Sequence, residues 1–151
     1  RKILEDMMYK LEKEFLEKTE DLTEETNRRE IIAETELEKL KGEYPKISNE
    51  YLNYLKEIGS GSFRESQFRV QKYLFDLEDI GLEEDYELKK GIMFFGMNFS
   101  GDFSGFDFTK NPELVVEFWH EDGTIYKTKK TFKEYIRQQM LMGENGEDIS
   151  E

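Results

Sequence analysis

The aromatic segment at residues 91–128 constrains the fold more than any other part of this chain. Its apolar residues occur in short runs, which are rich in the branched and aromatic side chains that strands prefer and are separated by turn residues. Glu121, Asp122 and Gly123 form one such turn, because Asp and Gly tolerate the positive φ angles of tight hairpins. Consecutive strands with short connections predict an antiparallel meander. The predicted strands span residues 92–97, 103–108, 114–119 and 124–128.

The chain before this sheet has the spacing of helices. Residues 1–18 carry an apolar side chain at every fourth position, which predicts an amphipathic helix. A second helix is expected from Asn27 to residue 41, since Glu30 follows Asn27 by three residues in a capping pattern. The apolar stripe of the first helix consists of Ile3, Met7, Leu11 and Phe15.

A third helix is expected after Ser48, whose hydroxyl is a good N-cap. This helix ends at Gly59, and residues 60–62 are expected to form a tight loop. Residues 68–77 are then the predicted first strand of the sheet, followed by an acidic loop.

A capping box at Thr131 and Glu134 predicts a final helix that continues to about residue 142. The sequence therefore predicts an α+β fold with N-terminal helices, a mostly antiparallel sheet of about four to six strands and a closing C-terminal helix. Residues 1–142 are expected to form one domain, in which residues 1–30 are a helical extension. Residues 143–151 are expected to be a solvated acidic tail.

The formal net charge of −13 is spread along the chain. Such a surface repels phosphate backbones and argues against nucleic-acid binding, whereas it attracts basic proteins. The alternative is that the charge only keeps the protein soluble. The densest acidic cluster contains Asp76, Glu78, Asp79, Glu83, Glu84, Asp85 and Glu87.

The chain contains no cysteine, which excludes disulfides and thiolate metal sites and fits a reducing cytoplasm. No run approaches the roughly 18–20 apolar residues that cross a bilayer, and no secretory leader pattern is found. The expected location is therefore the cytoplasm, without membrane binding. Because the sequence opens on Arg1, a leader removed from a longer chain stays an alternative.

Asp102 and Asp107 are the candidates for a catalytic carboxylate pair. Five residues apart on one regular strand, their side chains point to opposite faces, unless a bulge at Gly105 changes the alternation. We expect Asp102 to stabilise a turn and Asp107 to bind loop backbone. His120 is the single histidine, and no nucleophile motif accompanies it. The sequence therefore predicts no catalytic residue, no metal and no cofactor, and gives His120 a structural or interface role.

Four motifs in this order resemble the SMI/KNR-like branch of the SUKH superfamily, which is named after a fungal cell-wall-assembly regulator. They are YPKISNEYLNYLKEIGSGSFRESQF, FFGMNFSGDFSGFDF, VVEFWHEDGTIY and KTFKEYI. The similarity covers approximately residues 34–141. It implies an α+β domain with a mostly antiparallel sheet, and it supplies no catalytic residues. It also implies a function, since bacterial members often act as immunity proteins that neutralise toxins, many of them nucleases.

The leading hypothesis is therefore a non-enzymatic immunity protein that occludes the basic active surface of a toxin domain. The alternative is a regulatory or scaffolding module unrelated to toxin defence. The first helix must bury its apolar stripe on this domain or on a second copy, which would give a homodimer. Trp119 is either a partner anchor or a core residue. The predicted partner-binding residues are Phe99, Asp102, Phe103, Trp119 and His120, with Glu83, Glu84 and Asp85 as an acidic rim.

Overall fold

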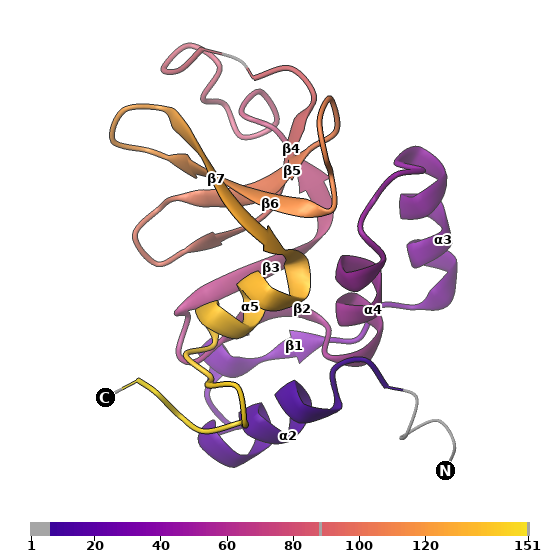
Figure 1. Cartoon of the computed structure of the whole chain (residues 1–151), viewed down its shortest axis with the longest axis vertical. Coiled ribbons are helices and arrows are strands. Elements are labelled where there is room, and N and C mark those ends of the chain that lie inside the picture. Colours follow the sequence, from indigo (N-terminus) through magenta and orange to yellow (C-terminus); the bar gives the residue numbers. More distant parts are fainter. Residues whose placement is uncertain (1–6, 88, 151) are drawn as a thin grey trace.

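An antiparallel sheet of seven strands forms the centre of the molecule (Figure 1). The computed structural model describes residues 7–87 and 89–150, and within these ranges the strands lie side by side in sequence order. The predicted α+β class and antiparallel meander are confirmed, but the predicted strand number of about four to six was too low. The strands are β1 (Arg29–Glu30), β2 (Ser60–Phe63), β3 (Phe68–Phe75), β4 (Ile92–Asn98), β5 (Phe103–Asp107), β6 (Leu114–Trp119) and β7 (Thr124–Thr131).

Strand β1 replaces the start of the helix predicted from Asn27, and β2 replaces the loop predicted at residues 60–62. Gly61 has a φ of 130°, and a side chain there would collide with the carbonyl oxygen of Arg28, so glycine permits the two backbones to pair. Asn27 does not begin a helix. It is buried, and its side chain accepts a hydrogen bond from the Glu65 backbone N–H at 2.7 Å and donates one to the Asp21 carbonyl. A short 3-10 helix, η1 (Glu25–Asn27), precedes β1. Helix α3 (Glu34–Glu43) begins only after β1.

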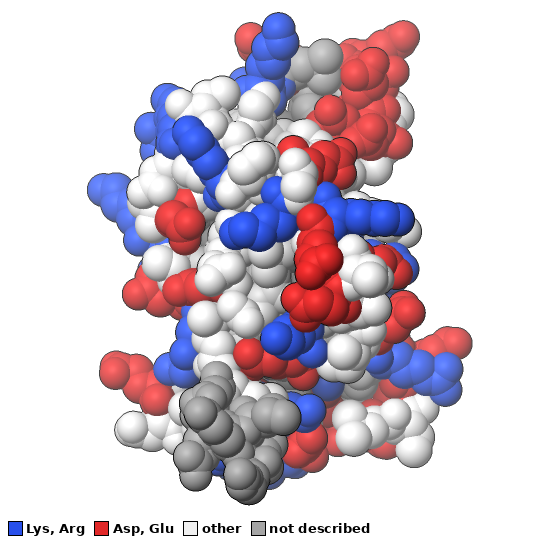
Figure 2. Space-filling view, turned by 90° about the vertical axis from the view of Figure 1, so that its right-hand side faces the viewer, with Lys and Arg blue, Asp and Glu red and all other residues white. Residues whose placement is uncertain are grey.

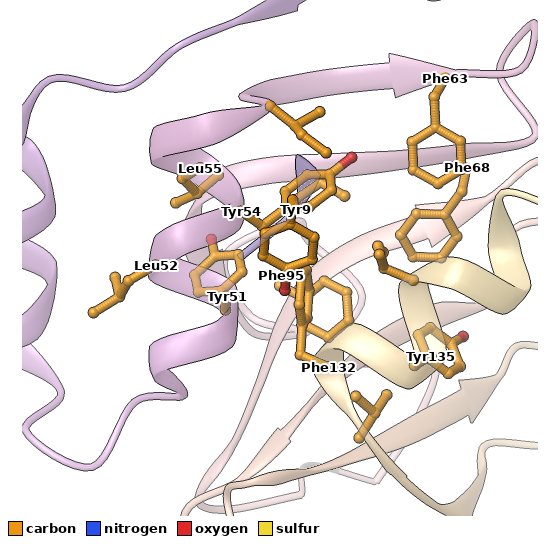
Figure 3. Close-up of a cluster of buried hydrophobic side chains, with 14 of the residues drawn as sticks. Tyr9, Tyr51, Leu52, Tyr54, Leu55, Phe63, Phe68, Phe95, Phe132 and Tyr135 are labelled. Atoms are coloured by element: carbon orange, nitrogen blue, oxygen red, sulfur yellow. The ribbon is translucent and has the colours of Figure 1, made fainter. Parts of the chain in front are cut away.

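Helices α4 (Asn49–Glu57) and α5 (Phe132–Gln139) cover one face of the sheet (Figures 1 and 3). Their predicted caps are confirmed: Ser48 accepts a hydrogen bond from the Tyr51 N–H at 3.3 Å, and Thr131 and Glu134 form a capping box. Helix α5 is shorter than predicted, because the chain turns at Leu141, which has a φ of 61°. Among the described residues, no helix combines the length and apolarity needed to cross a membrane.

Aromatic rings fill the space between these helices and the sheet (Figure 3). Phe95 of β4 lies at the centre, with its ring centroid 4.9 Å from Phe132 of α5 and 5.8 Å from Tyr51 of α4. Edge-to-face and tilted contacts of this kind contribute about 0.5–1.5 kcal/mol each beyond the area that they bury. This core fixes the sheet against α4 and α5 and leaves the far ends of the strands uncovered by helices (Figure 1).

Helix α2 (Lys10–Thr19) packs on this same domain. Phe15 of the predicted stripe is buried with Tyr9 and Leu16, whereas Leu11 is 36% exposed and Ile3 lies outside the described residues. Glu12 is also buried, and its Oε2 lies 2.6 Å from Nη2 of Arg137 on α5. The helix therefore buries one face against its own domain, which was one of the two predicted alternatives.

The acidic connection after β3 covers the second face of the sheet with residues 76–87. Its apolar residues Leu77, Leu82 and Tyr86 pack against a second cluster that includes Phe94 and Phe118. Its acidic side chains remain on the surface, where they gather at the upper right corner of Figure 2. The connection thus serves as a covering layer as well as a source of negative charge.

The segment at residues 143–150 folds back on the domain, although most of its side chains are exposed. Met142 and Asp148 form an isolated bridge, and the Asp148 carboxylate lies 3.2 Å from Nη2 of Arg64. The backbone N–H of Ile149 donates to the carbonyl of Leu141 at 2.9 Å. The sequence predicted a solvated tail, whereas these contacts hold its described part beside β2.

Candidate protein-binding surface

The turn between β4 and β5 is held by the side chain of Asn98. Its Oδ1 accepts hydrogen bonds from the backbone N–H groups of Ser100 and Asp102, both at 3.0 Å. Gly101 occupies the left-handed region with a φ of 94°, which favours glycine. The turn therefore has a defined shape, and it presents Phe99 with 74% of its surface exposed.

Asp102 joins this turn to the end of β6. Its Oδ1 accepts from the His120 backbone N–H at 3.0 Å and lies 2.7 Å from Nδ1 of the His120 ring. Partial burial raises the pKa of the Asp102 carboxyl, but the hydrogen bonds from His120 and Asn98 outweigh it and lower the pKa overall. The two neighbouring turns are thus connected through an ionised carboxylate. Asp107 instead accepts from the Thr109 N–H, as the sequence predicted, so the two carboxylates have separate local partners.

We expect Asp102→Asn to destabilise the protein at neutral pH but not in acid. Because the folded-state pKa of Asp102 is lowered, its contribution is present above the unfolded pKa and is lost as the pH falls through the folded pKa. The difference should be below about 1 kcal/mol, since the site is partly exposed. Urea unfolding of both proteins at about pH 7 and about pH 2.5 measures it. A difference of the same size at both values would contradict the assignment.

Trp119 and Tyr126 form an exposed aromatic pair on the face that carries α5. Their rings are stacked with centroids 5.1 Å apart and planes 18° apart, and they are 37% and 47% exposed. Nε1 of Trp119 donates to Oε1 of Glu117 at 3.0 Å, while Oε2 of Glu117 accepts from the Tyr135 hydroxyl at 2.7 Å. The alternative that Trp119 is a core residue is therefore wrong. It is a partly exposed ring in contact with Tyr126 and Glu117.

A hollow of about 380 Å³ lies beside this aromatic pair, between β7 and α5. Tyr135 lies at the edge of this hollow, and the pKa of its phenol is raised. Burial is the main cause, and the carboxylates of Glu117 and Asp102 add to it, whereas the hydrogen bond with Ser104 acts in the opposite direction. Aromatic faces next to ionised carboxylates suit an arginine or lysine side chain, which stacks on the ring and pairs with the carboxylate. The lining of the hollow includes Gln67, Glu117, Tyr126, Thr128, Lys130, Tyr135, Gln138, Gln139 and Leu141.

The predicted acidic rim reaches this surface from the other face of the sheet. The Tyr86 hydroxyl donates to the carbonyl of His120 at 2.7 Å, and its ring packs edge-on against Phe118 at 4.8 Å. This contact places the exposed Glu83, Glu84 and Asp85 near the β6–β7 turn but on the side opposite Trp119. Of the predicted residues, Asp102 and His120 are in direct contact. The acidic rim is connected to His120 through Tyr86.

Phe103 does not belong to the exposed part of this surface. It is only 6% exposed, and its ring is stacked on Phe118 and in contact with Phe94 and Phe75. The residue follows the turn directly, so side-chain alternation turns it into the second core cluster. Phe99 is thus the exposed phenylalanine at this turn, and Phe103 supports the sheet beneath it.

Sequence reasoning missed Glu117, Tyr126 and Tyr86. The first two could have been found from the hairpin register, since pairing Trp119 with Thr124 places Glu117 opposite Tyr126 on the same face as Trp119. No comparable signal predicts the contact of Tyr86 with His120, which joins residues 34 positions apart. Within the described ranges, no group of three or more His, Asp and Glu side chains is arranged to hold a metal ion.

The family model of the SMI1-KNR4 cell-wall family, SUKH_6, matches residues 34–136. A search of curated proteins and a search of solved structures found no match. The matched region begins at the first residue of α3 and ends within α5. It includes the two turns and the aromatic pair, but not Gln138, Gln139 and Leu141 of the hollow. The resemblance seen in the sequence is confirmed, and the chain belongs to the SMI1-KNR4 cell-wall family.

Proposed function

We propose that this chain is a non-enzymatic binding protein, acting in the cytoplasm as an immunity protein that neutralises a toxin by occluding its basic active surface. Membership of a family of toxin-immunity and cell-wall-related binding modules supports this function. The observation that carries it is the exposed pair of Trp119 and Tyr126, held against the Glu117 carboxylate. Trp and Tyr are enriched among the residues that contribute most to binding at protein interfaces, and a neighbouring carboxylate favours a basic partner.

Binding would use the aromatic pair and the acidic loop differently. A lysine or arginine of the toxin would stack on Trp119 and pair with the Glu117 carboxylate. The stacked side chain would exclude water from this contact. Glu83, Glu84 and Asp85, exposed on the acidic loop, would attract the toxin from a distance without needing a fixed geometry. The complex would therefore form quickly through the loop and dissociate slowly through the aromatic pair.

The test is binding to a toxin chosen from the products of the neighbouring genes, with and without Trp119. We expect the chain to inhibit the toxin, and Trp119→Ala to raise Kd about thirtyfold, or about 2 kcal/mol, mainly through faster dissociation. Because Trp119 is exposed at the strand end, the variant should keep its circular dichroism spectrum. An unchanged Kd in a folded variant would place the interface elsewhere.

Charge neutralisation separates steering from contact. Changing Glu83, Glu84 and Asp85 to their amides should lower the association rate and flatten its dependence on salt, since screening acts over about 10 Å at 0.1 M. The matched control changes Glu34, Glu36 and Glu38, which are exposed on α3 at the other side of the molecule (Figure 1). Equal effects of both triple variants would mean that only net charge matters. Binding to a regulatory protein without inhibition of any toxin would favour a scaffolding role.

A further inference from the structure

Strand β7 leaves one edge of the sheet open. It is the last strand, and in the described part of the chain its only strand partner is β6. With eight residues it is as long as β3, and Thr124, Tyr126, Lys127 and Lys129 are exposed. An outer strand of this length presents a row of backbone N–H and C=O groups to any extended chain of matching chemistry.

The edge is basic in an otherwise acidic protein. Residues 123–133 contain four lysines and no Asp or Glu, although the whole chain has a net charge of −13. Lys127 and Lys129 lie on one side of the strand and Lys130 on the other, beside two different cavities. None of these three lysines forms a salt bridge with a described residue. Figure 2 shows basic side chains along the upper left, away from the acidic corner.

An apolar cavity opens next to the basic edge. It has a volume of about 180 Å³, and Leu114, Val115 and Val116 contribute its apolar wall. It lies where the pairing of β6 with β7 is interrupted by a bulge, beside Lys129, whose φ is 62°. The rest of its lining is polar and consists of Lys110, Lys127 and Lys129 together with Asn111 and Asp107. Oδ1 of Asp107 already accepts hydrogen bonds from Thr109, so the three ammonium groups are the lining groups open to a carboxylate.

We propose that the outer edge of β7 binds an extended acidic segment of a partner protein as an added strand, with one apolar side chain in this cavity. Backbone hydrogen bonds would hold the segment, and its Asp or Glu residues would pair with Lys127 and Lys129. The same lysines oppose pairing with β7 of a second copy, because like charges would then face each other. Lys127 and Lys129 line a different cavity from Tyr126 and Glu117 of the proposed function, so different variants test the two proposals.

The probe is a capped peptide that alternates glutamate with valine, titrated into the full ¹⁵N-labelled chain. We expect shifts and slower hydrogen exchange in the amides of β7, and binding that weakens with salt. Lys127→Glu with Lys129→Glu should raise Kd at least about tenfold, since two attractive contacts become repulsive. Lys39→Glu with Lys41→Glu, on the exposed surface of α3, is the matched control and should bind the peptide as the parent does.

A second peptide tests the strand pairing itself. Methylation of the backbone nitrogen at every second residue removes hydrogen-bond donors but keeps charge and side chains, and it should abolish binding. Unchanged binding of this peptide would overturn the added strand and leave only charge attraction. Equal weakening in the α3 control would overturn the assignment to β7. A dimer that protects the β7 amides without peptide would show a second copy on the edge, contrary to the proposal.

Discussion

Replacing Arg137 with methionine will lower the free energy of unfolding by about 3–5 kcal/mol. Glu12 is buried, its Oε2 accepts from both Nε and Nη2 of Arg137, and its Oε1 has no hydrogen-bond partner. Removal of the guanidinium therefore leaves an uncompensated charge in the interface between α2 and α5. Urea unfolding at neutral pH measures the loss as a change in midpoint at constant slope.

Two further variants show that the loss comes from the buried charge. Glu12→Leu combined with Arg137→Met removes both charges and should recover most of the stability, because a buried pair often contributes little relative to apolar residues. Lys10→Met breaks the exposed pair with Glu14 on the same helix and should cost only about 0.3–0.5 kcal/mol. A loss for Arg137→Met no larger than that of Lys10→Met would mean that α2 is not docked against α5.

Phe95→Ala is expected to cost about 3–5 kcal/mol, while Phe99→Ala, four residues later, should change stability by no more than about 0.5 kcal/mol. Phe95 is fully buried and contacts rings from α4, α5 and β5, so alanine leaves a cavity that these rigid neighbours cannot fill. Phe99 is 74% exposed at a turn and loses few contacts.

The same urea experiment compares the two phenylalanine variants, with circular dichroism to confirm a common fold. Equal losses at both positions would show that the turn at Phe99 packs against the domain. A loss below about 1 kcal/mol at Phe95 would contradict the aromatic core between sheet and helices.

Local signals explain why the sheet from β3 to β7 and the caps of α4 and α5 could be predicted. A hairpin turn, a capping serine and a capping box each act over two to four residues, so a single sequence contains them in full. Trp119, His120 and Asp102 were found in the same way, because they adjoin turns. The register of the β6–β7 hairpin would also have given Glu117 and Tyr126.

The rest depends on contacts between distant residues. Gly61 appears in the sequence as part of a serine-rich loop, and only the approach of Arg28 makes it a strand residue. Asn27 matches the pattern of an N-cap, yet in the folded chain its side chain forms hydrogen bonds with the backbone of Asp21 and Glu65. The covering role of residues 76–87 likewise follows from the packing of Tyr86 on Phe118, which no local pattern encodes.

The order of the strands has a consequence for synthesis on the ribosome. From β3 to β7 every strand pairs with the strand that precedes it in the chain, so this part of the sheet can grow strand by strand as the polypeptide emerges. Helix α2 differs, because Glu12 must wait 125 residues for Arg137. Until then its carboxylate stays in water, since burial without a counter-charge is costly. The ion pair therefore makes the docking of the first described helix depend on translation of the last.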